Sequence, residues 1–147
     1  MTLSQAKEVI IKSMLYEVEH CNDPGYKRKI VGLASGAGTG KSDIMEQAAE
    51  ELDGLGINWY SEFVNLTGSD GTDLGFMPWV QNCNGTLKAE FVPFSTLERM
   101  INCTDETLFV FDEVGSYSPL IQSYLMQVFL LGEVKGHKFS KHAHFAF

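Results

Sequence analysis

A glycine-rich segment that ends in lysine and serine is the part of this sequence best suited to bind a phosphate chain. It runs Ile30-Val-Gly-Leu-Ala-Ser-Gly-Ala-Gly-Thr-Gly-Lys41-Ser42, so an apolar stretch passes into glycines and then into Gly-Lys-Ser. Successive backbone N–H groups in such a turn can point into one concavity, and the amino terminus of a following helix favours the same anion. The Lys41 ammonium group would then reach the β- and γ-phosphates of a nucleotide, and the Ser42 hydroxyl would bind Mg²⁺.

This segment departs at one position from the P-loop (Walker A) pattern G-x-x-x-x-G-K-[ST], because Ser35 stands where the pattern begins with glycine. The glycines that remain still leave the backbone free to approach a ligand. We therefore expect the phosphate to be bound by Ser35, Gly36, Ala37, Gly38, Thr39, Gly40, Lys41 and Ser42. The alternative is a flexible glycine turn beside a surface lysine.

A second chemical signal lies further along the chain, where Thr107-Leu-Phe-Val-Phe111 leads directly into Asp112 and Glu113. Consecutive apolar residues are typical of a strand buried on both faces of a parallel sheet, and such sheets bind ligands at the carboxyl ends of their strands. In this Walker B interpretation Asp112 contacts Mg²⁺, usually through water, and Glu113 is the general base that polarises the attacking water. Alone, the pattern also fits a strand that meets a polar turn. Paired with the glycine-rich segment, it gives both phosphate and metal their ligands.

The elements that must position these residues alternate between helix and strand, which predicts an α/β fold in one domain, residues 1–147. We expect helices from Thr2 or Ser4 to His20, from the P-loop to Gly54 or Gly56, from Ser95, and after Ser118-Pro119. We expect strands from Ile30, over 57–66, over 107–111 and over 144–147. The spacing of Thr2 and Gln5 predicts a capping box, and Ser118-Pro119 predicts an N-cap followed by an N1 proline. Residues 67–78 are polar and glycine-rich without periodicity, so we interpret them as a loop.

Composition limits the possible functions of this chain. Its 147 residues are 44% hydrophobic and carry a formal net charge of −8, which argues against nonspecific binding to nucleic acid or to an acidic membrane. The short basic run Tyr26-Lys-Arg-Lys29 is expected to be a solvated lead-in to the first strand. Cys21, Cys83 and Cys103 are odd in number and widely spaced, so they indicate neither a disulfide framework nor a zinc cluster. No stretch approaches membrane-span length, so we expect a cytoplasmic protein.

The end of the sequence is rich in histidine and lysine. His142 and His144 alternate and would share one face of a strand, but no cysteine or carboxylate lies near them at ligand spacing. We therefore expect solvated loop and strand residues here rather than a metal site. The two tryptophans and ten phenylalanines have no basic residues interleaved with them, which favours core packing over a nucleic-acid stacking surface.

Taken together, these motifs resemble the AAA+ ATPases, and more narrowly the MoxR-like ATPases, which include small phage and bacterial forms. The resemblance covers nearly the whole chain. It rests on Ser35–Ser42, on Asp73-Leu-Gly-Phe-Met-Pro78, on Phe111-Asp-Glu-Val114, and on Ser118-Pro119 followed by the helix from Gln122 to Gly132. It implies a P-loop NTPase fold, a three-layer αβα sandwich with parallel strand order 5-1-4-3-2. It also implies ATP and Mg²⁺ at the carboxyl edge and assembly into a ring, typically a hexamer, that remodels partner proteins.

The family pattern includes a polar sensor 1 residue after the fourth strand, followed by an arginine finger and a helical lid. His144-Phe-Ala-Phe147 resembles that fourth strand, so we expect sensor 1, the lid and the fifth strand of the family pattern to be missing from this sequence. Of the family's arginine positions, neither Arg28 nor Arg99 corresponds to the finger. A charge-stabilising arginine is worth several orders of magnitude in phosphoryl-transfer rate. We therefore expect ATP–Mg²⁺ binding with weak hydrolysis unless another chain supplies the missing groups.

Three classes of function remain open at this point. The first is an ATPase module that couples ATP to the remodelling of a partner, with Lys41 and Glu113 as its catalytic residues. The second is a nucleotide-dependent interaction module that does not hydrolyse ATP. The third is a small P-loop kinase, which is disfavoured because Asp112-Glu113 provides a base for water and an arginine-rich lid is missing.

Overall fold

The computed structural model describes residues 2–34, 38–56, 58–66, 75–93 and 95–147. Its helices are α1 (Leu3–His20), α2 (Lys41–Gly54), α3 (Ser95–Asn102) and α4 (Pro119–Leu131). Its strands are β1 (Ile30–Val31), β2 (Trp59–Val64), β3 (Phe76–Cys83), β4 (Thr86–Pro93), β5 (Glu106–Phe111), β6 (Glu133–Val134), β7 (His137–Lys138) and β8 (Ala143–Ala146), and a 3₁₀ turn covers Val114–Ser116. None of the helices in these described ranges combines the length and apolar character that a membrane crossing requires.

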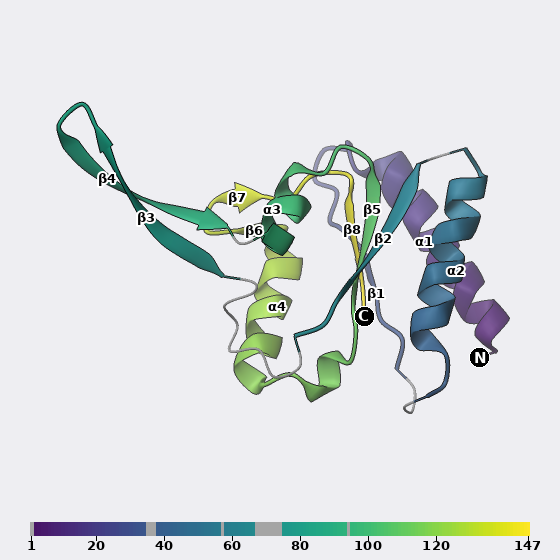
Figure 1. Ribbon diagram of the computed structural model, residues 1–147. Coiled ribbons are helices and arrows are strands. Elements are labelled where there is room, and N and C mark those ends of the chain that lie inside the picture. The colour runs from purple at the N-terminus through teal and green to yellow at the C-terminus, as the bar shows by residue number, and fades with distance from the viewer. Residues whose placement is uncertain (1, 35–37, 57, 67–74, 94) are drawn as a thin grey trace.

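A four-stranded parallel sheet forms the centre of the molecule, with strand order β1-β8-β5-β2 (Figure 1). Trp59 of β2 is in register with Glu106 of β5, and Thr107 of β5 is in register with Ala143 of β8. In chain order these are the first, fourth, third and second strands of the sheet. The order implied by the family resemblance is therefore confirmed for these four strands.

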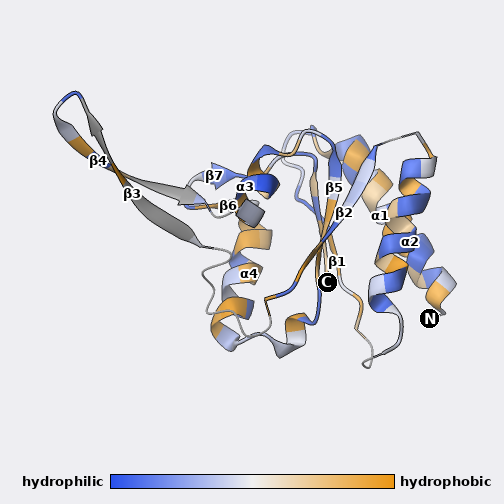
Figure 2. Cartoon of the chain, viewed as in Figure 1, coloured by the Kyte–Doolittle hydropathy of each residue, from blue (hydrophilic) through white to orange (hydrophobic). Residues whose placement is uncertain are grey.

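Helices cover both faces of the sheet, as the alternation of side chains along β5 requires. Leu108 and Val110 pack in a buried cluster with residues of α1 and α2, whereas Phe109 and Phe111 pack in a second cluster with residues of α3 and α4. Figure 1 shows the two pairs of helices on opposite sides of the strands, and Figure 2 shows hydrophobic residues along the strands and through α4. The predicted mixed α/β layout is confirmed.

The helix boundaries follow the capping patterns of the sequence. The Thr2 hydroxyl accepts a hydrogen bond from the Gln5 backbone N–H at 3.3 Å, and the Gln5 side chain accepts one from the Thr2 N–H at 2.8 Å. At α4 the Ser118 hydroxyl accepts from the Ile121 N–H at 3.4 Å, and a proline follows it. In α2 the apolar residues Ile44, Met45, Ala48, Ala49 and Leu52 lie at helical spacing and are all buried.

The loop predicted over 67–78 is wrong where it can be compared with the structure. Residues 67–74 lie outside the described residues, but 76–78 belong to β3, which pairs antiparallel with β4. This hairpin projects away from the body of the molecule (Figure 1). Its turn holds Asn84 at φ 54° and Gly85 at φ 82°. Two positive φ angles in succession are typical of a type I′ turn, and Asn-Gly is the pair that tolerates it best.

Candidate active site

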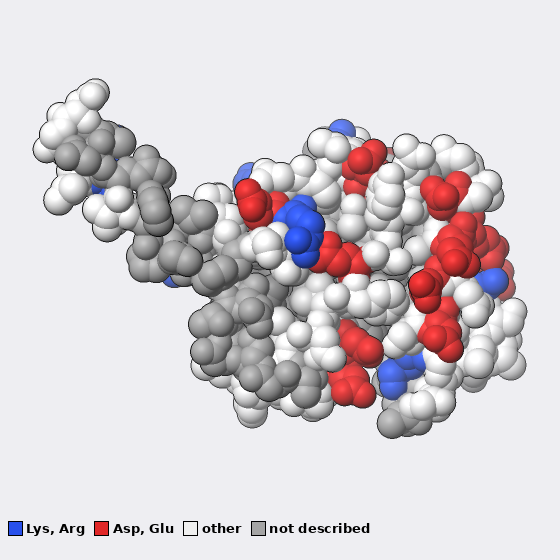
Figure 3. All heavy atoms as spheres, viewed as in Figure 1, with Lys and Arg blue, Asp and Glu red and all other residues white. Residues whose placement is uncertain are grey.

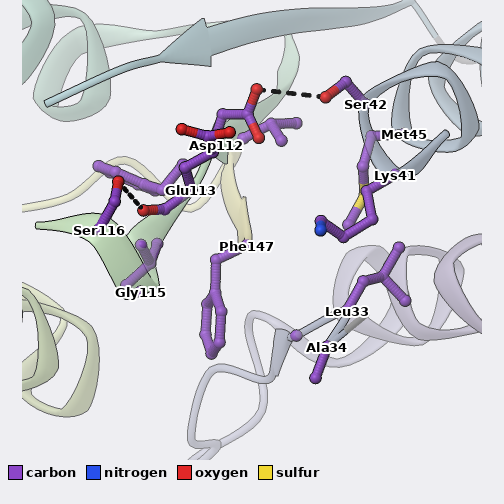
Figure 4. Close-up of a pocket in the computed structure, with 14 residues that line it drawn as sticks. Leu33, Ala34, Lys41, Ser42, Met45, Asp112, Glu113, Gly115, Ser116 and Phe147 are labelled. Atoms are coloured by element: carbon purple, nitrogen blue, oxygen red, sulfur yellow. Dashed lines mark hydrogen bonds between the residues drawn. The ribbon is translucent and has the colours of Figure 1, made fainter. Parts of the chain in front are cut away.

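Of the predicted site residues, Lys41, Ser42, Asp112 and Glu113 line one pocket of about 630 Å³ at the carboxyl edge of the sheet, whereas Gly38, Thr39 and Gly40 are not part of its lining. It lies between the amino end of α2 and the segment that follows β5. Lys41 and Ser42 come from α2, and Asp112 and Glu113 follow β5 (Figure 4). Two motifs far apart in the sequence therefore share one pocket, at the edge where parallel sheets place their ligands.

The amino end of α2 has the backbone geometry of an anion-binding turn. Gly38 and Gly40 have φ angles of 72° and 78°, in the left-handed region that glycine adopts without a steric penalty. Gly40 is the N-cap of α2 and its carbonyl accepts the Ile44 N–H, but no side chain caps the helix. The helix dipole at this amino end favours an anion. The predicted ligands Ser35, Gly36 and Ala37 lie outside the described residues.

A direct hydrogen bond joins the two motifs. The Ser42 hydroxyl donates to Asp112 Oδ2 at 3.2 Å, although the residues are 70 positions apart in the chain (Figure 4). The Asp112 backbone N–H donates to the Val64 carbonyl at 3.1 Å, so the end of β2 fixes the aspartate beside α2. A hydroxyl and a carboxylate at this distance form the kind of oxygen donor set that Mg²⁺ takes alongside phosphate and water oxygens.

The backbone holds Glu113 in an unusual conformation next to that pair. Glu113 has φ 54° and ψ 38°, in the left-handed region that non-glycine residues seldom adopt. Its carbonyl accepts hydrogen bonds from both the N–H and the hydroxyl of Ser116, each at 2.8 Å. The strain is local to the residue predicted to be the general base, and strained backbone of this kind is concentrated at functional sites.

Two residues that the sequence interpretation missed hold the connection after β5 in place. The Tyr117 hydroxyl donates to the Asp112 carbonyl at 2.6 Å and contacts the Val64 carbonyl at 3.1 Å. Burial raises the pKa of Tyr117, and the negative charges of Asp112 and Glu113 add to this effect. The Gln122 amide donates to the carbonyls of Val114 and Tyr117 at 3.2 and 3.0 Å. Their only sequence signal was their position just after Asp-Glu.

Phe147 also lines the pocket, between its Lys41 side and its Glu113 side in Figure 4. Its carbonyl accepts the Leu33 N–H at 2.5 Å, and its N–H donates to the Val31 carbonyl at 2.9 Å. A Cβ on Gly32 would lie 2.7 Å from the Phe147 ring, so glycine at this position allows the ring to approach the first strand. Nothing in the sequence pattern pointed to this contact.

The expected solvated histidine tail is wrong for His144, which is completely buried at the opposite edge of the sheet. Its Nε2 lies 2.5 Å from Glu106 Oε2, and its Nδ1 lies 3.7 Å from Glu17 Oε2. His142 Nδ1 lies 2.8 Å from the other Glu106 oxygen. Burial lowers the pKa of His144, but its hydrogen bond to Glu106 and the negative charges of Glu106 and Glu17 outweigh burial and raise that pKa overall. The sequence interpretation missed the two glutamates because they come from α1 and β5.

Neither arginine of the sequence lines the pocket at the carboxyl edge. Arg99 forms a two-pronged ion pair with Glu62, at 2.5 and 2.7 Å. Arg28 lies at the amino edge of the sheet, where its Nη2 donates to the Ser140 carbonyl at 2.9 Å. The sequence analysis expected Tyr26–Lys29 to be a solvated segment before the first strand. This prediction is wrong for Arg28, whose side chain is largely enclosed and lies over the Phe145 ring.

Comparison with protein-family models and with curated proteins finds no match to this chain. Among the described residues no group of three or more histidine, cysteine, aspartate or glutamate side chains could hold a metal ion. A divalent cation at the Ser42–Asp112 pair would therefore need further oxygens from a ligand and from water, which is the usual situation for magnesium bound with a nucleotide.

Proposed function

We propose that this chain binds ATP with Mg²⁺ in the pocket between α2 and β5 and is an ATPase module of the AAA+ MoxR-like type, with a P-loop NTPase fold. The observation that carries the proposal is the hydrogen bond of 3.2 Å between Ser42 and Asp112. This bond joins the Ser42 hydroxyl, which follows Gly40-Lys41, to the Asp112 carboxylate, which directly follows the buried strand β5. In P-loop NTPases these two groups together hold the magnesium that binds with the nucleotide.

In this proposal each pocket residue has a separate task. Backbone N–H groups from Ser35 to Ser42 surround the phosphates, and Lys41 neutralises charge on the β- and γ-phosphates. Ser42 and Asp112 hold Mg²⁺, which polarises the γ-phosphate when bound. Glu113 accepts the proton of the attacking water as a general base.

Hydrolysis by this chain alone is proposed to be slow, because both arginines are engaged away from the pocket. Arg99 is paired with Glu62 and Arg28 donates to Ser140. A second copy in a ring, or another chain, would supply the missing cation. Ring assembly, remodelling of a partner protein and a cytoplasmic location belong to the same proposal.

The positions of these arginines also favour a second candidate, in which ATP binding alone regulates assembly and no hydrolysis follows. The two candidates share the site and differ in turnover. A small P-loop kinase is the least supported candidate, because the proposal assigns Glu113, which lines the pocket, as a base for water.

An equilibrium titration with ATP and Mg²⁺ tests the proposal. We expect wild type to bind, Lys41→Ala to lose at least about tenfold in affinity, and Lys12→Ala, at an exposed lysine paired with Glu8, to bind as wild type does. Steady-state phosphate release then separates the two candidates, since release that Glu113→Gln removes indicates an ATPase. Absence of binding in wild type would contradict both.

A further inference from the structure

A second pocket of about 330 Å³ lies at the amino-terminal edge of the sheet, away from the proposed ATP site. It is bordered by the carboxyl ends of α1 and α4, by the segment that enters β1, and by the residues that precede β8. Its polar lining is unusual for this chain, because Lys27, Arg28 and Lys141 all contribute to it. The whole chain has a formal net charge of −8, and acidic side chains predominate on the face shown in Figure 3.

The positive charge of this pocket is not balanced by its own lining. Glu17 is its acidic residue, and that carboxylate already accepts a hydrogen bond from the Tyr26 hydroxyl at 2.5 Å and another from the Lys29 backbone N–H. Each helix carboxyl end contributes roughly half a negative charge. Three cationic side chains against one carboxylate and two helix ends leave a net positive charge of about one.

Arg28 brings a guanidinium to the lining of the pocket. Its Nη2 donates to the Ser140 carbonyl, but Nη1 is buried and has no hydrogen-bond partner among the described residues. Burial lowers the pKa of Arg28 more than the nearby charge of Glu17 raises it, so a further anionic partner would stabilise the guanidinium. A buried charge of this kind is normally paired, and an anionic oxygen is the partner that a guanidinium binds best. Lys27 and Lys141 are exposed and form no ion pair within the described part of the chain.

The remaining lining is apolar. The rings of Phe129 and Phe139 contribute to the pocket and are otherwise buried, with 4% and 7% of their surfaces exposed. Leu130 and Leu131 border it and leave 79% and 70% exposed. Such large exposure of adjacent leucines indicates that apolar surface continues from the pocket onto the end of α4.

We propose that this pocket binds an amphipathic anion, a carboxylate or phosphate monoester joined to an apolar chain. The anionic head group pairs with Arg28, Lys27 and Lys141, and the apolar chain lies against Phe129, Leu130 and Leu131. A volume of 330 Å³ fits a ligand at the small end of the usual range. The pocket does not include the proposed ATP-binding residues, so this inference stands or falls independently of that function.

Titrations followed by two-dimensional amide NMR of the full chain test this proposal with four probes. Octanoate and octyl phosphate carry both halves of the proposed ligand, inorganic phosphate carries the head group alone, and 1-octanol carries the apolar chain alone. We expect octanoate or octyl phosphate to shift amides of Tyr26–Lys29 and Leu130–Lys141 and to saturate, and which one binds more tightly identifies the head group. Phosphate and octanol should each bind at least about tenfold more weakly. Equal binding of octanol, equal binding of phosphate, or shifts confined to other regions would overturn the proposal.

Substitutions then locate the head group. Arg28→Gln should weaken octanoate or octyl phosphate roughly tenfold, and the double variant Lys27→Gln/Lys141→Gln should weaken it by roughly fivefold or more. Lys88→Gln, at an exposed lysine of the β3–β4 hairpin, should leave binding unchanged. The double variant alters only exposed side chains, so it keeps the test valid if Arg28→Gln fails to fold. Unchanged affinity in the double variant would contradict the assigned head-group contacts.

Discussion

Ser42 and Asp112 are joined by a hydrogen bond of 3.2 Å, and each is the residue of its motif that would hold the metal. Ser42 lies in the first turn of α2, and Asp112 directly follows β5. The contact depends on β2, because the Val64 carbonyl accepts the Asp112 N–H at 3.1 Å. Three elements of the fold thus bring two side-chain oxygens to one point.

Removal of either oxygen ligand should reduce ATP affinity in a magnesium-dependent way. We expect Ser42→Ala and Asp112→Asn to lose about tenfold or more in affinity when Mg²⁺ is present, and much less when it is chelated. Isothermal titration calorimetry with and without EDTA measures both values. Ser123→Ala, at an exposed serine of α4, is the matched control. An equal loss with and without the metal would show that these side chains act on something other than Mg²⁺.

The strained backbone of Glu113 makes a prediction about stability as well as activity. Glycine adopts φ 54° without the steric penalty that alanine carries, which is about 1–2 kcal/mol and is partly offset by the greater unfolded-state entropy of glycine. Glu113→Gly should therefore be more stable than Glu113→Ala by about 1 kcal/mol, and both should lack any hydrolysis that wild type shows. Urea denaturation compares the free energies of unfolding. Equal stabilities would indicate that the backbone relaxes at this position.

The buried His144 should stabilise the fold in a pH-dependent way. Its pKa is raised above the ordinary 6.5, so its contribution is full below pH 6.5 and declines as the pH rises through the raised value. Burial tends to raise the pKa values of Glu17 and Glu106, but it is outweighed by the hydrogen bonds that each carboxylate accepts and by the charge of nearby His144, so both pKa values are lowered below 4.5. Their contribution is present above pH 4.5 and is lost as the pH falls through the lowered values. Stability should therefore decline on both sides of the range between about 4.5 and 6.5.

The His144→Gln variant tests this network. It removes the positive charge that offsets the buried carboxylates of Glu17 and Glu106. We therefore expect a loss of about 3 kcal/mol or more in the free energy of unfolding. The alkaline decline seen in wild type should also disappear. Thermal denaturation across the pH range measures both effects, with His137→Gln at an exposed histidine as the control. A wild-type alkaline decline that persists unchanged in His144→Gln would assign it to another group.

The β3–β4 hairpin should open more readily than the central sheet. It projects from the body in Figure 1, and Val80 and Leu87 expose 60% and 73% of their surfaces. A two-stranded hairpin is marginally stable in water unless a hydrophobic face is covered. We expect its amides to exchange with deuterium well before those of β5, whose residues from Leu108 to Phe111 are buried. Comparable protection of the two elements would mean that a surface covers the hairpin in solution.

The sequence predicted the parts of the fold whose signals are local. The capping box at Thr2 and the Ser118-Pro119 start of α4 needed only neighbouring residues, and both are confirmed. The β3–β4 hairpin also had a local signal, because Asn84-Gly85 favours a type I′ turn. It was missed because the glycine-rich polar stretch before it was extended as a loop into residues 76–78.

The long-range contacts of the molecule could not be predicted in the same way. His144 meets Glu17 and Glu106 only because the strand order places β8 beside β5 and packs α1 against them. Its burial depends on that topology, not on any spacing within the sequence. The same applies to Tyr117, whose hydroxyl reaches the Val64 carbonyl 53 residues away. Candidate ligands could be read from motif types, whereas the groups that position them required the fold.

The central claim is that ATP–Mg²⁺ binds between α2 and the end of β5. Its most direct test is to map the binding site of ATP–Mg²⁺ on the isotope-labelled chain. Amide NMR during the titration should show saturable shifts at Gly38–Asp43 and at Asp112–Ser116, because the proposed site lies between these two segments. Residues of the hairpin tip around Asn84 should not shift. Saturable shifts at both pocket segments would support an ATP site built from α2 and the end of β5, and absence of shifts there would contradict it.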